Sequence, residues 1–320
     1  MFEDDEEEYF RFRKMIENDG NFVHESTIAG SKMQKELISL FTSITKERLG
    51  NRTDLVESFL PQFGLGCRRL TPGPGYLEAL TQDNVELIKT GIASINEKGV
   101  RLTDGRQIDV DVLVCATGFN TTAVPPFQVT GMNEETLAQR LTPVPETYLT
   151  IMVDNFPNYF MMFGPNAGIG AGPLTALLEA QGDYIVKCIR KLQKEDYAWM
   201  MPQQDRVKDF SEYVGEYFKR TVYMDDCRSW YKTPTGDRIS ALWPGSILHA
   251  MEAWRSPRWE DFDYKPMDSN RLRWLGNGWS VCLNQGGGDP SFYLNPDVVD
   301  VPVLGTPESD ARCAARPFSH

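Results

Sequence analysis

The chain has 320 residues, of which 41% are hydrophobic and 24% are charged, as in a globular protein that buries one large core or two modest ones. Its formal net charge of -12 argues against a nucleic-acid partner, because binding phosphates requires a concentrated basic face. The longest apolar stretch, residues 159–180, is broken by prolines and glycines. It therefore lacks the run of about 20 apolar residues that spans a membrane, and we expect no membrane partner.

The cysteines and histidines show no metal-binding or redox spacing. Six cysteines are scattered without a CxxC pattern, and we interpret all six as cytosolic thiols: Cys67, Cys115, Cys188, Cys227, Cys282 and Cys313. The three histidines lie far apart, so we expect no metal. The N-terminus reads MFEDDEEEYF, which is acidic where a secretion signal is basic and then apolar, and this favours a cytoplasmic protein.

The first third of the chain is predicted to be helical and then looped. A charged helix covers residues 6–18, and apolar residues at helical spacing predict a helix pair over 31–59 with a break at Gly50-Asn51. Residues 61–76, PQFGLGCRRLTPGPGY, are dense in glycine and proline and predict a shaped loop before a short helix at 76–80.

Short strands are predicted next. Segments 84–88, 91–95 and 99–103 precede the hairpin signal Asp104-Gly105, and the chain then enters 110–119, VDVLVCATGF. The unbroken apolar run within it is typical of a strand buried on both faces, and Gly118 ends that strand. Any central strand of an α/β sheet that stops at a glycine is an equally good interpretation of this segment alone.

A second unit of strand, loop and helix follows. A strand is predicted over 158–163, then the glycine-rich run 163–173, FGPNAGIGAGP, and amphipathic helices over 175–192 and 207–218 that cover a sheet. The glycines suit close approach of a cofactor to the backbone, and the free N–H groups of the next helix favour electron-rich atoms. The alternative is a glycine-rich connection that binds nothing.

Two further features carry potential chemistry. Arg68 and Arg69 stand side by side in the constrained loop, where two guanidinium groups that point differently could serve two anionic ligands. A solvated basic pair is the ordinary alternative. Trp230, in CRSWYK, would ordinarily be a core aromatic residue.

Taken together, these segments resemble a known family. A buried strand that ends in ATG resembles the junction between the nucleotide domains of two-dinucleotide-binding flavoproteins, and ATGF is the form found in flavin-containing and Baeyer–Villiger monooxygenases. The resemblance implies an α/β fold, the C-terminal part of a FAD/NAD(P)-binding, Rossmann-like flavoprotein with an N-terminal helical segment. Gly118 would let the backbone pass close to a cofactor.

The resemblance also implies roles for single residues. GCRRLTPGPGYLEAL is similar to a loop of fungal Baeyer–Villiger-type monooxygenases, in which Arg68 would face the NADPH 2′-phosphate and Arg69 would be the catalytic residue that stabilises the flavin peroxide. Trp230 would reach the nicotinamide cofactor. The remaining implied cofactor-binding positions are Ala116, Thr117, Gly118, Phe119, Gly164, Pro165 and Asn166, and those on the substrate side are Gly172, Pro173 and Leu174.

The resemblance covers only the later part of the family pattern. It implies a helical segment at 1–66, the remainder of an NADPH-binding domain at 67–112, the C-terminal part of an FAD-binding domain at 113–266 and a partly disordered extension at 267–320. The GxGxxG turns and the FxGxxxHxxxW fingerprint of full members are absent, and GIGAG at 168–172 has the wrong spacing. The chain therefore resembles a shortened monooxygenase whose N-terminal half is missing or supplied in trans.

The implied function is an FAD- and NADPH-dependent Baeyer–Villiger oxygen insertion. One oxygen of O₂ enters next to a small-molecule ketone to give an ester or lactone, in fungal polyketide or terpenoid secondary metabolism. One alternative is a catalytically incomplete remnant or interaction module. Another is an N- or S-oxygenating flavin monooxygenase, which shares the ATGF motif but not the arginine pair.

Overall fold

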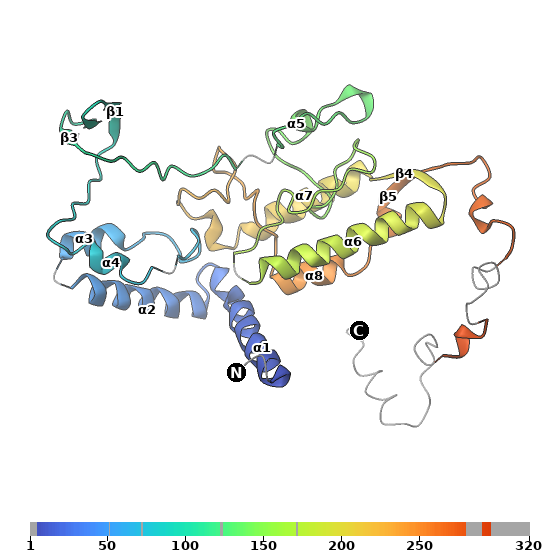
Figure 1. Cartoon of the computed structure of the whole chain (residues 1–320), viewed down its shortest axis with the longest axis horizontal. Helices are drawn as coiled ribbons and strands as arrows, with labels where there is room; N and C mark the ends of the chain where they lie inside the picture. The colour runs from blue at the N-terminus through green and yellow to red at the C-terminus, as the bar shows by residue number, and fades with distance from the viewer. Residues whose placement is uncertain are drawn as a thin grey trace. The chain divides into compact units, whose positions relative to one another are not determined.

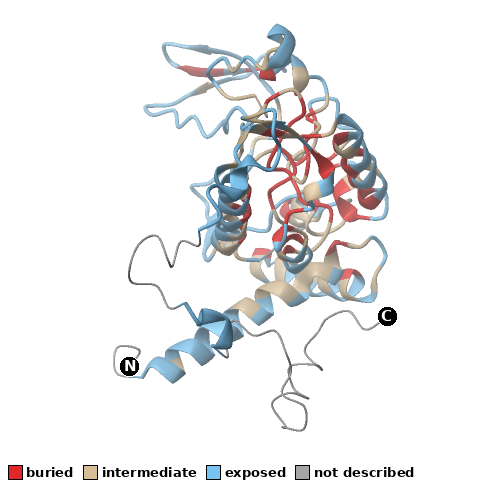
Figure 2. Ribbon diagram, turned by 90° about the vertical axis from the view of Figure 1, so that its right-hand side faces the viewer, coloured by how far each residue is buried: buried red, intermediate tan, exposed pale blue. Residues whose placement is uncertain are grey.

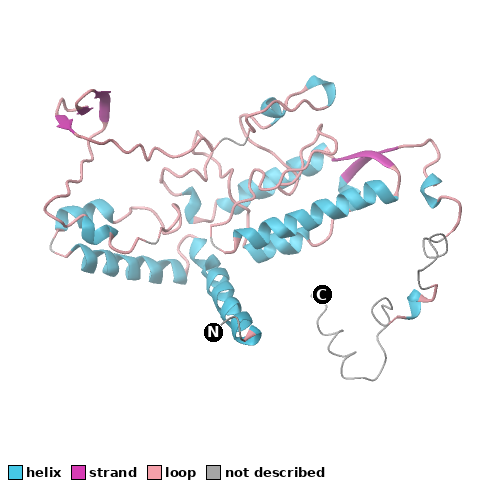
Figure 3. Ribbon diagram, viewed as in Figure 1, coloured by secondary structure: helices cyan, strands magenta, loops and turns pink. Residues whose placement is uncertain are grey.

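The computed structural model describes residues 5–50, 52–71, 73–121, 124–170, 172–279 and 290–295. Its contacts divide the chain into two compact units, residues 1–267 and residues 268–320. The elements follow one another as Figure 1 labels them, and Figure 3 shows that long loops connect the helices. Of the extension predicted at 267–320, the structure describes residues 267–279 and 290–295, and the rest lies outside the described residues.

Helices open the first unit, as predicted. Helix α1 (Glu6–Phe22) begins at Asp5, whose carboxylate accepts the Glu8 N–H at 2.9 Å, and none of its residues is buried (Figure 2). A short 3-10 helix, η1 (Val23–Thr27), leads to α2 (Lys32–Leu49), which ends at the left-handed Gly50, and α3 (Thr53–Phe59) follows. The predicted helix pair and its break are confirmed.

A three-stranded antiparallel sheet follows the short helix α4 (Tyr76–Ala79). Its order is β1 (Ile92–Asn96), β2 (Gly99–Leu102) and β3 (Gln107–Asp109), and Val100 pairs with both Ile95 and Ile108. The turn between β2 and β3 passes through Gly105 at φ +90°, a conformation that favours glycine. The strands predicted at 91–95 and 99–103 are confirmed, whereas residues 84–88 form no strand and that prediction was wrong.

The strand predicted within 110–119 is also absent. These residues have no regular secondary structure, and Val112 and Phe119 are 77% and 96% exposed. A strand buried on both faces exists only where neighbouring strands and covering layers supply its hydrogen bonds and apolar contacts. The described part of the chain supplies no strand partner to this segment, so its apolar side chains stand in solvent.

The main core is built around helices. It lies among α6 (Leu174–Lys194), α7 (Gln204–Phe218), α8 (Ile247–Trp254) and the antiparallel pair β4 (Tyr197–Pro202) and β5 (Phe262–Pro266). Tyr184, Met200 and Trp254 are among its fully buried side chains. The two predicted amphipathic helices are confirmed, but residues 158–163 form turns and irregular backbone rather than the predicted strand.

Smaller elements complete the first unit. A second apolar cluster surrounds α5 (Leu137–Arg140), where Leu137 and Phe156 are buried. Three 3-10 helices lie elsewhere: η2 (Met132–Glu134), η3 (Val222–Met224) and η4 (Trp259–Asp261). No helix among the described residues is both long and apolar enough to cross a membrane.

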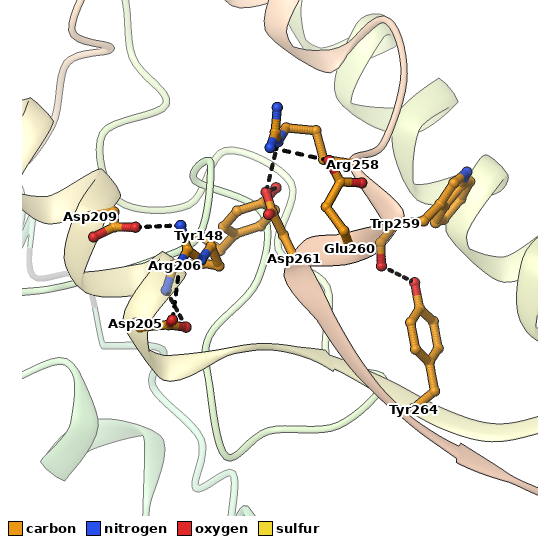
Figure 4. A network of polar contacts seen from close by, with 9 residues as sticks. All are labelled: Tyr148, Asp205, Arg206, Asp209, Arg258, Trp259, Glu260, Asp261 and Tyr264. Atoms are coloured by element: carbon orange, nitrogen blue, oxygen red, sulfur yellow. Dashed lines mark hydrogen bonds and ion pairs between the residues drawn. The ribbon is translucent and has the colours of Figure 1, made fainter.

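A polar network anchors β5 to the core (Figure 4). The Tyr148 hydroxyl donates to Asp261 Oδ2 at 2.6 Å, and Arg258 donates to the same oxygen at 3.1 Å. Burial, together with this hydrogen bond to Asp261, raises the pKa of Tyr148 above its usual range. Tyr148 therefore stays protonated and holds the strand end in place.

The second unit contains short turns. Its described elements are the 3-10 helices η5 (Arg273–Leu275) and η6 (Phe292–Leu294). Within it, Arg273 pairs with Asp268 at 2.7 Å.

Candidate functional site

Residues 61–71, here called the arginine loop, are fixed to a segment far away in the sequence. Cys67 is completely buried and forms a disulfide with Cys227, 160 residues further on. The Gly64 N–H donates to Asp225 Oδ2 at 2.7 Å. A Cβ atom on Gly64 would stand only 2.7 Å from the Val222 Cβ, so this close approach requires glycine.

The disulfide corrects the prediction that all the cysteines are free thiols. Cys67 and Cys227 are bonded, Cys115 and Cys188 are free, and Cys282 and Cys313 lie outside the described residues. Sequence spacing gave no sign of the pairing, because the fold alone brings the two positions to a Cα separation of 6.4 Å. Burial raises the pKa of the free Cys188 thiol to about 12, which makes it unreactive.

The two arginines project from this fixed loop. Both are exposed, and neither forms an ion pair with a carboxylate of the described chain. The Arg68 guanidinium lies 5.9 Å from the centre of the Phe63 ring. Arg69 lies near the buried Tyr231: burial raises the pKa of Tyr231, and the charge of Arg69 acts in the opposite direction.

Trp230 lies on the partner segment of the disulfide, three residues after Cys227. Its ring is 48% exposed and stands 4.7 Å from that of Tyr231, measured between centroids. The Lys232 ammonium donates to the Asp225 carbonyl oxygen at 2.6 Å and stiffens the same turn. The disulfide therefore places the arginine pair and the half-exposed tryptophan on covalently joined segments.

The glycine loop, residues 163–173 apart from 171, is held by a third segment. The Asn166 side-chain amide donates to the carbonyl oxygens of Ile239 and Leu242 at 3.0 and 3.1 Å, and its backbone N–H donates to Ser240 at 2.7 Å. Asn166 is buried, as is its neighbour Pro165. The Asn166 side-chain amide is thus occupied in holding the loop, and the cofactor role that the resemblance implies for this residue stays a prediction.

Several glycines of this loop are explained by packing within the chain. A Cβ on Gly164 would collide with the Thr150 carbonyl oxygen, one on Gly168 would lie 2.7 Å from the Ala241 oxygen, and one on Gly170 would collide with the Tyr223 hydroxyl. These contacts favour the structural interpretation of the glycines at those positions. Further along, Gly172 at φ +109° and Leu174 are exposed at the start of α6, whose first turn has no side-chain cap.

Tyr223 connects the two parts of the site. Its hydroxyl lies against Gly170, its backbone oxygen lies 3.8 Å from Cys67 Sγ, and its ring centre is 5.8 Å from that of Tyr231. Burial raises its pKa. Sequence reasoning missed Tyr223, because an aromatic residue two positions before Asp225 carries no motif.

The ATGF segment does not join this assembly. Ala116, Thr117, Gly118 and Phe119 are exposed, and Gly118 is left-handed at φ +90°. Within the described residues no hydrogen bond, ion pair or ring contact ties these four residues to the arginine loop or to the glycine loop. The structure therefore brings together Arg68, Arg69, Trp230 and the glycine loop, and leaves the ATGF residues apart.

Comparison with curated proteins finds FAD-binding monooxygenases among the relatives of the chain. The chain is 36% identical over 297 residues to FAD-binding monooxygenase tazF of Aspergillus terreus, covering 92% of this chain and 53% of that protein. It is 38% identical over 248 residues to FAD-binding monooxygenase stcW of Emericella nidulans, covering 77% of this chain and 41% of the relative. No protein-family model matches.

Solved structures give the same class of fold. A steroid monooxygenase bound to NADP matches 76% of this chain and 47% of its own with a TM-score of 0.65 at 22% identity. Cyclohexanone monooxygenase in a closed form matches 75% of this chain and 46% of its own with a TM-score of 0.64 at 20% identity. At these identities the likeness concerns the fold, and it confirms the predicted flavoprotein class.

The fold is thus that of part of a flavin-dependent monooxygenase. By sequence, the chain is a homologue of the FAD-binding monooxygenases and spans about half the length of the curated relatives it matches. This partial coverage is consistent with the C-terminal portion that the motifs indicate. Among the described residues, no cluster of histidine, cysteine, aspartate and glutamate could hold a metal ion.

Proposed function

We propose that the chain is the C-terminal portion of an FAD- and NADPH-dependent monooxygenase of the Baeyer–Villiger type. Its substrates would be O₂ and a small ketone, and its product an ester or lactone of fungal secondary metabolism. The observation that carries the proposal is the arginine pair, fixed by the disulfide beside the Trp230 segment. The relatives' names support the cofactor FAD, and the bound NADP of the steroid monooxygenase supports the second cofactor.

The described residues fit a phosphate-bearing cofactor. The Arg68 guanidinium has no carboxylate partner in the described structure, and the disulfide of the neighbouring Cys67 fixes its backbone. A guanidinium binds a phosphate through two parallel hydrogen bonds. Trp230 is half-exposed, and we propose that its indole N–H binds a nicotinamide ribose or amide. We therefore assign Arg68 and Trp230 to NADPH.

The second arginine is assigned to the chemical step. Bound FAD, reduced by NADPH, would supply the activation of O₂, and the protein would position and stabilise the reacting groups. Arg69 holds a permanent positive charge and would offset negative charge that develops beside it. The exposed residues Gly172 and Leu174 at the start of α6 would lie on the substrate side, while Asn166 would act by holding the glycine loop.

We also propose that further protein covers the exposed ATGF segment. We assign 67–112 to an NADPH-binding domain and 113–266 to an FAD-binding domain, each of which needs strands beyond those described here. The apolar side chains exposed at 112–119 suit burial against such strands, from a longer form of the chain or from an N-terminal half in trans. We expect a cytoplasmic location, although the disulfide removes one argument for it.

A titration of NADP⁺ and NAD⁺ into the purified chain tests the assignment. Wild type should bind NADP⁺ more tightly by about tenfold or more, because one charge-assisted phosphate contact contributes roughly 1.5–3 kcal/mol. Arg68→Ala should abolish this preference. Arg101→Ala, which removes another exposed arginine on β2, should retain it. Equal affinities for the two dinucleotides in wild type would remove Arg68 from a 2′-phosphate site.

A further inference from the structure

A large cavity lies on one face of α2. Its volume is about 510 Å³, within the range of about 300–1,000 Å³ typical of small-molecule pockets. Its walls come from α2, the arginine loop and the segment that contains Val222 and Asp225. The space is partly open to solvent, so a small molecule could enter it.

One face of α2 turns toward this cavity. The helix contributes residues at positions 34, 35, 38, 41, 42 and 45, the spacing of a single helical face. Ile38 and Phe41 on this face are 41% and 36% exposed, although both are apolar. Phe59 and Phe63 line the cavity from other segments, so aromatic rings from separate parts of the chain surround the space.

Hydrogen bonds and the disulfide fix the positions of the cavity walls. The Gln34 amide nitrogen donates to the carbonyl oxygens of Ser26 and Leu65 at 2.5 and 2.8 Å, and so ties α2 to the arginine loop. The opposite wall is tied to the same loop by Gly64 and Asp225 and by the disulfide. The cavity is therefore preformed, and a ligand entering it would not have to order its walls.

The polar groups indicate what kind of ligand fits. Both N–H groups of the Gln34 amide are used, and its Oε1 is buried with no hydrogen-bond partner in the described structure. A buried acceptor left without a donor is unfavourable, so a donor brought close by an occupant would stabilise this wall. The hydroxyls of Thr42 and Thr45 add polar groups on the same helix face. Lys35 and Asp225 contribute one charge of each sign, and most of the other lining side chains are apolar.

We propose that this cavity binds an uncharged, ring-bearing small molecule that carries a hydroxyl donor. The rings of Phe41, Phe59 and Phe63 supply the apolar contacts, and Gln34 and the threonines supply the polar ones. The site uses neither Arg68 nor Arg69 as a ligand, so it does not depend on the proposed cofactor function.

Binding of 2-naphthol to the full 320-residue chain, measured by calorimetry, tests the site. We expect one molecule to bind per chain with a Kd at or below about 100 µM. Thr42→Phe, which fills the cavity, should weaken binding by about tenfold or more. Ser43→Phe makes the same change at the next, exposed position outside the lining, and should bind as wild type does.

A second ligand and a second variant complete the test. 2-Methoxynaphthalene keeps the rings and lacks the hydroxyl donor, so it should bind several-fold more weakly, by roughly three- to tenfold. If circular dichroism shows that Thr42→Phe does not fold, Thr45→Leu with Ser43→Leu as its control replaces it.

Three results would overturn the proposal. The first is the absence of 2-naphthol binding up to about 1 mM. The second is an equal loss of binding in Thr42→Phe and Ser43→Phe. The third is self-association of the wild-type chain that Thr42→Phe disperses, since a second copy would then be what covers this face of α2.

Discussion

At the scale of single residues, Arg68 and Arg69 differ from Arg140 and Arg48, each of which pairs with a carboxylate of the described chain. Arg140 is paired with the buried Asp154 at 2.7 Å, and Arg48 with Glu78 at 2.6 Å. The hydrogen bond from Arg48 stabilises the charged form of Glu78 and lowers the pKa of this carboxyl to about 2. In the described structure no carboxylate satisfies the pair at 68 and 69, so their charge is available to a ligand.

Replacing Arg69 should separate oxygenation from flavin reduction. In any preparation of the chain that oxygenates a ketone, Arg69→Ala should lower turnover by about 10²–10³-fold, as expected for the loss of a charge that acts on developing negative charge. Reduction of the flavin by NADPH, followed by stopped-flow absorbance, should change little. Arg69→Lys keeps the charge without the planar fork and should retain an intermediate rate. Oxygenation by Arg69→Ala at the wild-type rate would refute the assigned role.

Asn166 should contribute to stability through its side chain. Asn166→Ala removes two donors from buried carbonyl oxygens, and urea unfolding should show a loss of roughly 2–4 kcal/mol. Asn133→Ala is the matched control. Asn133 has a left-handed backbone at φ 57°, similar to φ 62° at Asn166, but its side chain is exposed. Similar losses in the two variants would mean that backbone conformation, and not the hydrogen bonds, explains the effect.

At the scale of elements, the sequence predicted helices well and strands poorly. Helices α2, α3, α6 and α7 follow from local periodicity and from breaks such as Gly50. The hairpin around Gly105 was also predictable, since its turn and both strands are close in sequence. The strands predicted at 84–88, 110–116 and 158–163 are absent, because a strand depends on neighbours that local sequence does not specify.

The candidate site was predictable in its residues but not in its assembly. The glycines and prolines around Arg68 predicted a constrained loop, yet nothing near Cys67 or Cys227 indicated that they would bond. The glycine loop was recognised by composition, whereas its contacts with Tyr223 and Ala241 arise from packing across many residues. Long-range contacts of this kind are decided by the whole fold.

The disulfide should stabilise the first unit. Because it closes a loop across 160 residues, Cys227→Ser should lower the free energy of unfolding by roughly 2–5 kcal/mol under oxidising conditions. Cys115→Ser removes an exposed free thiol and should leave stability unchanged. Adding a reductant should lower the free energy of unfolding of wild type to that of Cys227→Ser. An identical unfolding midpoint for the two proteins under oxidising conditions would contradict a structural role of the disulfide.

At the scale of the whole molecule, apolar side chains are exposed in several of the described segments. Val112 and Val114 are 77% and 80% exposed, and α1 has no buried residue. The chain also spans about half the length of its curated relatives. These facts together suit a chain whose faces are covered by further protein.

The double variant Val112→Lys, Val114→Lys tests that interpretation. Both side chains are exposed, so we expect the free energy of unfolding to change by less than about 0.5 kcal/mol. Self-association of the purified chain, measured by sedimentation velocity, should fall because the apolar run is interrupted by charge. A large loss of stability would instead show that these valines are buried in the isolated chain.

The covalent link between the arginine loop and the Trp230 segment is the feature on which the proposed cofactor site depends, and a peptide map tests it directly. The purified chain is alkylated without reduction, digested with trypsin and analysed by mass spectrometry. Cleavage after Arg52, Arg68, Arg220 and Arg228 should release peptides 53–68 and 221–228 as one disulfide-linked species that a reductant separates. Recovery of both peptides separately, each with an alkylated cysteine, would contradict the link and leave the arginine pair without its anchor.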